Sequence, residues 1–223
     1  MSKLQNDYEA IAHEIKSLHQ EIKSIGKNNL KIRSLYKGCH ILFSPLIYKP
    51  HYLLIGFNPG GGYYKHHGKI AENFQSMPKL EYYLSDHKLG QETKDVFVSS
   101  GLGSELERSS VKINFYPWAT NHIDDFNDLI SILPKDLKVE IFHKARVWNR
   151  KIIDKVEPEI IICEGFAAFR EVEALFETKN NYAEDKNTIY FESYNNTKIF
   201  AYKRCLSSII NKSEVSTKLK KLN

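Results

Sequence analysis

The stretch HYLLIGFNPGGGYY, residues 51–64, decides how the rest of the chain can be arranged. Residues 53–57 are apolar apart from one glycine, which is typical of a central strand that is covered on both faces of a parallel sheet. Pro59 cannot donate to a sheet, and the three glycines after it allow backbone conformations closed to other residues, so we expect the strand to end at Asn58. In open α/β sheets, ligands bind at this carboxyl edge.

Asn58 is the polar side chain of this turn, and it allows two interpretations. A strand followed by Asn-Pro-Gly-Gly-Gly is also typical of a plain surface loop. An amide held between a buried strand and a proline can, however, orient a water molecule or read the edge of a base. We therefore take Asn58 as the first candidate functional residue.

Composition limits the class of protein. The 223 residues are 42% hydrophobic and 26% charged, with a mean hydropathy of -0.44, as in soluble globular proteins. We expect one α/β domain over residues 1–223, with residues 1–28 as an N-terminal helical extension and residues 212–223 as a basic C-terminal tail. No apolar run reaches the length of a membrane span, and the first ten residues lack the core of a signal peptide, so we expect a cytoplasmic protein with no membrane partner.

Net charge and cysteine content indicate which partners and cofactors are compatible with the sequence. Lys and Arg outnumber Asp and Glu by 32 to 27, and the net charge of +5 permits a polyanionic partner without requiring one. Cys39, Cys163 and Cys205 are too few and too scattered for a disulfide framework or a zinc site, and the adjacent His66 and His67 lack a third ligand at metal spacing. We expect no metal, no cofactor and no obligatory protein partner.

Strands and helices alternate along the rest of the chain. Apolar spacing predicts helices over residues 4–25, 122–133, 135–156 and 167–177. Strands are expected at residues 111–115 and 159–163, followed by two β-rich runs on either side of a turn at Asn195 and Asn196. Repetition of strand, helix and strand favours a mostly parallel sheet with helices on both faces.

Two further strand ends carry polar residues. The strand at residues 111–115 repeats the design of the first, because Asn114 is soon followed by a proline that stops the strand. The last strand leads into Lys203, Arg204 and Ser207. Between the first two strands lies a segment dense in Tyr, Phe, His and Lys, whose aromatic side chains are as typical of base stacking as of core packing.

Together these segments resemble the uracil-DNA glycosylase superfamily. GFNPG, residues 56–60, is similar to the first motif of the mismatch-specific and single-strand-selective branches. A later strand ends in Asn114, another leads through Gly165 to a helix with an alanine at 167 or 168, and a final strand precedes a short polar motif. The resemblance covers about residues 52–208.

This resemblance implies a fold, a partner and an activity. The fold would be a three-layer α/β/α sandwich around a mostly parallel, four-stranded sheet. The partner would be DNA, single-stranded DNA included. The activity would be that of a DNA-repair hydrolase, which flips a uracil or a mismatched or damaged base and hydrolyses its N-glycosidic bond.

The resemblance also implies residue roles. Asn58 would orient the attacking water, Asn114 would hydrogen-bond the flipped base, and Tyr64 or Phe74 would stack on it. The remaining substrate-binding positions would be Gly56, Phe57, Pro59, Gly60 and Ser207.

The family's second motif is altered in this chain. It usually has a histidine followed by Pro-Ser after the last strand, where residues 202–208 here read YKRCLSS. Lys203 or Arg204 would then supply positive charge to the departing base, and no residue that wedges into the DNA minor groove is recognisable. The missing histidine favours the alternative, a non-catalytic relative that binds nucleic acid or a nucleotide. A phosphate-binding protein of another family would need a GxGxxG turn or a lysine and serine after the glycines, and the sequence has neither.

Overall fold

The computed structural model of the chain describes residues 3–61, 71–176, 183–192 and 196–222. They form two compact units, and each unit is assembled from three separate segments of the chain. Unit 1 comprises Met1–Leu42, Phe57–Gln75 and Asn114–Lys155, and unit 2 comprises Phe43–Gly56, Ser76–Ile113 and Val156–Asn223.

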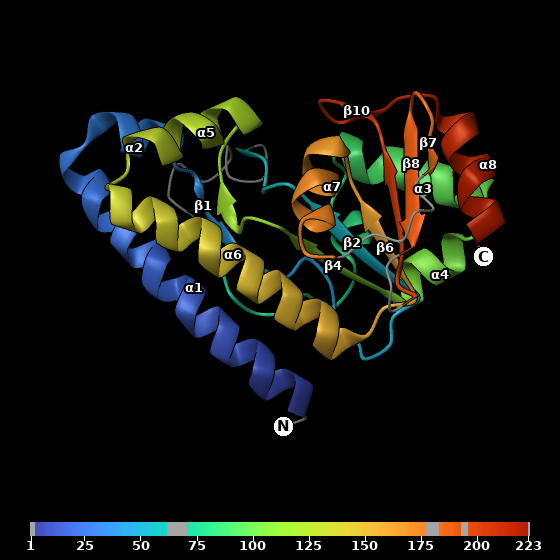
Figure 1. Cartoon of the computed structure of the whole chain (residues 1–223), viewed down its shortest axis with the longest axis horizontal. Helices are drawn as coiled ribbons and strands as arrows, with labels where there is room; N and C mark the ends of the chain where they lie inside the picture. Colours follow the sequence, from blue (N-terminus) through green and yellow to red (C-terminus); the bar gives the residue numbers. More distant parts are fainter. Residues whose placement is uncertain (1–2, 62–70, 177–182, 193–195, 223) are drawn as a thin grey trace. The chain divides into compact units, whose positions relative to one another are not determined.

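Unit 2 is built on a six-stranded sheet with the strand order β4-β2-β6-β9-β8-β7 (Figure 1). β2 (Tyr52–Gly56), β6 (Ile160–Cys163) and β9 (Lys198–Tyr202) run parallel to one another. β8 (Thr188–Glu192) and β7 (Ala183–Glu184) continue the sheet in antiparallel fashion, and β4 (Ser110–Asn114) lies beside β2. The sheet is mostly parallel, as expected, but it has two more strands than the four predicted because β8 folds back on β9 and pairs with β7.

The order of these strands creates a switch point in the sheet. In sequence, β2 is followed in this sheet by β4 on one side and then by β6 on the other. The chain therefore changes direction across the sheet between β2 and β6. In open α/β sheets, ligands bind beyond the carboxyl ends of the strands at such a switch point.

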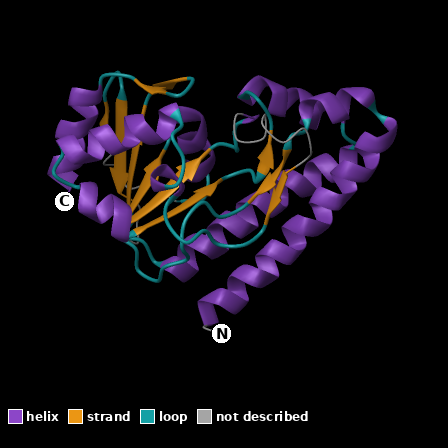
Figure 2. Ribbon diagram, turned by 180° about the vertical axis from the view of Figure 1, so that it is seen from behind, coloured by secondary structure: helices purple, strands orange, loops and turns teal. Residues whose placement is uncertain are grey.

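Helices cover both faces of this sheet (Figure 2). On one face α3 (Lys88–Ser99), α4 (Gly103–Arg108) and α8 (Lys212–Leu222) supply Phe97, Leu106 and Leu219 to a core with alternate residues of β2, β6 and β9. α7 (Phe166–Glu173) packs on β6 and β9, and its Phe169 contacts Phe191 of β8. Successive residues of a strand point to opposite faces, and Tyr190 faces the first core, so α7 covers the other face.

The C-terminal segment is part of this core. Val215 and Leu219 of α8 are fully buried, whereas Lys212 forms an ion pair of 2.9 Å with Glu92 of α3. Residues 212–223 were expected to form a basic C-terminal tail. Residues 212–222 form an amphipathic helix that carries these lysines and packs its apolar residues on the core.

Unit 1 is mainly helical. α1 (Lys3–Asn28) confirms the helix predicted at residues 4–25, and α5 (Ile123–Ile132) and α6 (Lys135–Val156) confirm the two helices separated by Pro134. α2 (Leu30–Leu35) is an additional short helix that is capped by Asn29, whose side chain accepts two backbone hydrogen bonds. β1 (Gly38–His40), β3 (Ala71–Asn73) and β5 (Trp118–Ala119) form a small sheet in the order β3-β1-β5.

A buried histidine connects α1 to this small sheet. The Nδ1 atom of His19 contacts the Tyr36 hydroxyl, and its Nε2 lies 3.0 Å from a carboxylate oxygen of Glu72. Burial lowers the pKa of His19 below its ordinary value of 6.5. A neutral ring fits both neighbours, because Nε2–H can donate a hydrogen bond to the Glu72 carboxylate while Nδ1 accepts a hydrogen bond from the Tyr36 hydroxyl.

The free energy of unfolding should therefore fall in mild acid. As the pH drops below 6.5, His19 becomes protonated in the unfolded chain but stays neutral in the folded protein. The free energy of unfolding therefore falls until the pH passes below the lower pKa of the folded state. Urea unfolding between about pH 7.5 and pH 5 measures this slope. His19→Gln should flatten the slope, and the exposed His143→Gln of α6 should not. Equal slopes in wild type and His19→Gln would contradict the assignment.

Candidate functional site

The turn that follows β2 pairs with the segment that follows β4. Tyr116 N donates to Phe57 O at 2.9 Å, and Thr120 N donates to Pro59 O at 3.2 Å. Gly60 and Thr120 form an isolated parallel bridge. These two segments of unit 1 therefore run side by side. β2 and β4, which lead into them, are neighbours in the sheet.

The Asn58 amide is held in one orientation. Its nitrogen lies 2.9 Å from Thr120 Oγ1, 3.3 Å from Trp118 O and 3.4 Å from Pro59 O. The two carbonyls only accept, and the Thr120 hydroxyl donates its own hydrogen to His122 O at 2.7 Å. All three neighbours thus require a donor, so the amide nitrogen must face them. The Asn58 oxygen points elsewhere, and no residue that the structure describes donates to it.

This arrangement gives Asn58 both a structural duty and a free acceptor. The half-buried amide ties the turn to the segment after β4, and its oxygen can accept a hydrogen bond from a ligand or a water. An amide oxygen is a very weak base, so it can orient a water molecule but cannot deprotonate it. The ring of Phe57 packs edge-on against Tyr116 and Phe126, at centroid distances of 5.1 and 5.5 Å, and closes the turn on one side.

Asn114 also keeps its side chain available. It ends β4, is half-buried, and forms no side-chain hydrogen bond with any residue in the described part of the chain. A free amide offers one donor group and one acceptor group, which is what recognition of a base edge requires. Asn58 and Asn114 both belong to unit 1.

The turn is tightly packed at Gly61. Neither Gly60 nor Gly61 has a positive φ, so the expectation that these glycines serve an unusual backbone conformation is wrong. A Cβ atom at Gly61 would lie 3.0 Å from Cγ and 3.2 Å from Cα of Asn121, and closer still to its Oδ1, whereas a Cβ at Gly60 would meet nothing within 4 Å. The turn needs the absence of a side chain at Gly61.

Alanine substitutions should separate these two glycines. Gly61→Ala must displace Asn121 and should lower the free energy of unfolding by about 1–3 kcal/mol. Gly60→Ala should change it by less than about 0.5 kcal/mol or stabilise slightly, because alanine restricts the unfolded chain. Urea unfolding of the two variants is the measurement. Equal effects would show that the contact with Asn121 is not tight.

A second candidate feature lies in unit 2, where the chain leaves β9. β10 (Arg204–Cys205) and β11 (Ser208–Ile209) form a hairpin, and Leu206 and Ser207 form its tip. Leu206 is 78% exposed and has a φ of +54°, a conformation that a leucine rarely adopts. The sequence pattern did not reveal this residue. A single leucine between polar residues is common in sequences, so it does not mark an exposed hairpin tip until the hairpin itself is known.

Two basic residues of this hairpin differ in their surroundings. Arg204 donates from Nη1 to Glu164 O and from Nη2 to Leu206 O, both at 3.0 Å. Lys203 is exposed, and its ammonium has no partner among residues 3–61, 71–176, 183–192 and 196–222. Lys203 is therefore the freer cation of the pair.

The other residues of the expected site are divided between the units. Phe74 of unit 1 packs beside α1, with its ring 5.8 Å from that of His19 and 5.8 Å from Lys16 Nζ. Tyr64 lies outside the described residues. Pro59 and Gly60 belong to unit 1 with Asn58, whereas Gly56, Lys203 and Ser207 belong to unit 2 with Arg204. That these residues gather at one cleft stays a prediction.

A buried charge cluster, which the sequence pattern did not indicate, lies in unit 2. Lys112 of β4 is 3% exposed, and its ammonium lies 3.5 Å from Glu81 and 3.6 Å from Glu164. Glu81 belongs to the 3-10 helix η2 (Glu81–Tyr83), and Glu164 directly follows β6. The ammonium also lies 4.7 Å from the centre of the Tyr82 ring.

Tyrosines complete this cluster. Glu164 Oε1 accepts hydrogen bonds from the hydroxyls of Tyr82 and, at 3.4 Å, of Tyr202. Burial, and then the nearby Glu164 carboxylate, raise the pKa of both tyrosines well above their ordinary value, so both remain donors. His87, at the start of α3, is 2.8 Å from Glu81 and is the more exposed member. Every charge of the cluster thus has a partner of opposite sign or a donor.

Loss of the central cation should be costly. Lys112→Met leaves the buried Glu164 carboxylate without its counter-charge and removes one of the two basic partners of Glu81, and it should lower the free energy of unfolding by about 3–5 kcal/mol. The exposed Lys79→Met, close to the same 3-10 helix, should change it by less than about 0.5 kcal/mol. Urea unfolding compares the two. A small effect of Lys112→Met would mean that solvent reaches the cluster.

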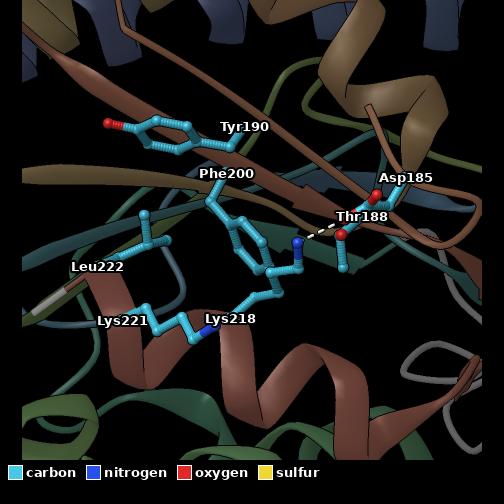
Figure 3. Close-up of a pocket in the computed structure, with 7 residues that line it drawn as sticks. All are labelled: Asp185, Thr188, Tyr190, Phe200, Lys218, Lys221 and Leu222. Carbon is cyan, nitrogen blue, oxygen red and sulfur yellow. Dashed lines mark hydrogen bonds and ion pairs between the residues drawn. The ribbon is translucent and has the colours of Figure 1, made fainter. Parts of the chain in front are cut away.

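A cavity of about 130 Å³ lies between the sheet and α8 (Figure 3). It is lined by Asp185, Thr188, Tyr190, Phe200, Lys218, Lys221 and Leu222. Ligand pockets commonly measure about 300–1,000 Å³. The cavity is too small for a nucleotide, and Lys218 reaches across it to pair with Asp185, so we assign it no ligand.

Within the described ranges, no three His, Cys, Asp or Glu side chains are grouped so that they could hold a metal ion. No helix in the same ranges has the length and apolar character needed to cross a membrane. No protein-family model matches the sequence, and no curated protein matches it significantly.

Proposed function

We propose that the protein is a DNA glycosylase-like enzyme that hydrolyses the N-glycosidic bond of a flipped base, either uracil or a mismatched or damaged base. The observation that carries the proposal is the orientation of Asn58. Three acceptors hold the amide nitrogen, and the oxygen is left to accept a hydrogen bond. This suits a residue that positions water, and it is not needed in a plain surface loop.

The fold is consistent with this role. Asn58 follows β2, one of the two strands at the switch point of the sheet, where α/β proteins bind ligands. We infer that β4, β2, β6 and β9 form the central sheet of a three-layer α/β/α sandwich of the glycosylase kind, to which β8 and β7 are added.

The proposed reaction needs little acid or base strength. The bond between the sugar carbon and the base breaks, and its electron pair leaves with the base. The oxygen of the water held by Asn58 then bonds to the electron-poor sugar carbon, and its proton passes to solvent. A departing base anion requires positive charge nearby, and the Lys203 ammonium, which has no partner in the described part of the chain, is the group that we assign to it.

The remaining roles follow from exposure and hydrogen bonding. The Asn114 amide offers a donor and an acceptor to the edge of the base. Leu206 is an exposed apolar side chain at the tip of a hairpin, which suits insertion between stacked bases. DNA, single- or double-stranded, is therefore the partner that we propose.

A nucleic-acid-binding relative without activity is the second candidate. Residues 202–208 contain no histidine, and both terminal nitrogens of Arg204 are engaged by backbone carbonyls. Such a protein would use Leu206 and Lys203 for binding and would have no reaction for Asn58 to assist.

Base release from oligonucleotides tests the proposal. Labelled single strands and duplexes that carry one uracil, one thymine mismatch or one alkylated base are incubated with the protein, and abasic sites are then cleaved with alkali. Asn58→Ala should lower the rate by about 10²–10⁴-fold, with DNA affinity changed far less. Asn127→Ala, an exposed asparagine of α5, is the matched control and should retain the wild-type rate.

Asn58→Asp preserves the size of the side chain, but it does not test the catalytic role of Asn58 alone. A carboxylate would set an oxygen against Trp118 O and Pro59 O, so this variant should lose stability as well as activity. The thermal midpoint of each variant is therefore measured beside its rate. Absence of base release by the wild-type protein from all three lesions, in both strand forms, would leave only the binding function.

A further inference from the structure

We infer that Arg204 is a positioning residue that fixes the Leu206 tip, and that Glu164 and the buried charge cluster hold Arg204 in place. The use of the tip on DNA rests on the proposed function. The positioning itself does not, because it follows from contacts within unit 2.

The tip conformation needs support. The φ of +54° at Leu206 brings its Cβ close to the following carbonyl, which makes this backbone region unfavourable for leucine. Such a conformation persists only where its surroundings enforce it. The side chain gives no such support, since it is 78% exposed.

Arg204 supplies that support. Its Nη2 donates to Leu206 O and its Nη1 to Glu164 O, both at 3.0 Å, so one rigid guanidinium joins the tip to the end of β6. The Nε atom is buried and has no hydrogen-bond partner among the described residues. A lysine has the same charge, but a single nitrogen cannot reproduce the planar fork that spans the two carbonyls.

Glu164 is a fixed point for Arg204. Its backbone N–H donates to Ile55 O at 2.9 Å, and its carboxylate lies in the charge cluster with Lys112 and the two tyrosines. The next residue, Gly165, has a φ of +114° and a ψ of 154°, which side-chain-bearing residues rarely adopt. The backbone hydrogen bond to Ile55 and the buried carboxylate therefore hold the Glu164 carbonyl where Arg204 meets it.

The second strand of the hairpin is held separately. Ile209 N donates to Glu92 Oε2 of α3 at 3.1 Å, and Glu92 also pairs with Lys212 at 2.9 Å. Both strands are thus tied to core elements, and the Leu206 side chain at the tip is exposed. An apolar side chain that is already ordered loses little conformational entropy when it enters a stack of bases.

This arrangement predicts which substrates depend on Arg204. In a duplex the target base must leave its stack, whereas in a single strand that cost is small. Arg204 should therefore govern activity on duplex DNA relative to single-stranded DNA, through Leu206.

The hairpin carries its own probe. Cys39 and Cys163 are buried and Cys205 is exposed, so a nitroxide reagent should label β10 selectively. Spectra of the labelled protein should show faster motion in Arg204→Gln and Arg204→Lys than in wild type. Arg170→Gln, an exposed arginine of α7, is the matched control and should leave the spectrum unchanged. An unchanged spectrum in both Arg204 variants would overturn the inference.

Activity provides the second measurement. Arg204→Gln should lower the ratio of duplex to single-strand base release by about 10- to 100-fold, and Leu206→Ala should lower it similarly. The double variant should be no worse than either alone, because both act through the tip. The inference would also be overturned if Leu206→Ala lowers the ratio of duplex to single-strand base release and Arg204→Gln leaves it unchanged. If no protein releases a base, the proposed function fails, and the label spectra still decide whether Arg204 positions the tip.

Discussion

Burial of β2 is the constraint on which most of the structure depends. All five of its residues are buried, so their backbone groups must find hydrogen-bond partners in flanking strands. β4 on one side and β6 on the other provide them, and helices close the two faces. Once β2 is central, the residues that follow it emerge at the switch point of the sheet. Asn58 owes its place to this arrangement, and Glu164 follows the neighbouring strand for the same reason.

The elements that could be predicted from sequence are those with a strong local pattern. β2 and β6 are continuous apolar runs, and α1 and α6 repeat apolar residues over many turns, so neighbouring residues alone identify them. The contacts of Asn58 were not predictable, because Trp118 and Thr120 lie about sixty residues away. The places of Asn58 and Asn114 at strand ends could be recognised in the sequence, but the sequence could not show which atom of the Asn58 amide has no donor among the described residues.

The charge cluster escaped prediction for a different reason. Lys112 alternates with apolar residues along β4, so the pattern assigns it to a solvated face. Glu81 and Glu164, which give it partners, come from a 3-10 helix and a strand end that are distant in sequence. A buried lysine is tolerable only with such partners. Its burial is therefore a property of the assembled unit and not of the strand that carries it.

The division of the chain into interleaved units has a consequence for how the protein acquires its structure. The backbone passes from one unit to the other at residues 42, 56, 75, 113 and 155, so neither unit is a continuous stretch that could be excised. The sheet needs β9, near the end of the chain, before β6 has both neighbours. During synthesis, unit 1 cannot close before its last segment, Asn114–Lys155, has been made, and the sheet of unit 2 cannot close before β9 has been made. Pairing between such distant segments slows folding, and the early segments must meanwhile avoid aggregation with exposed apolar surfaces.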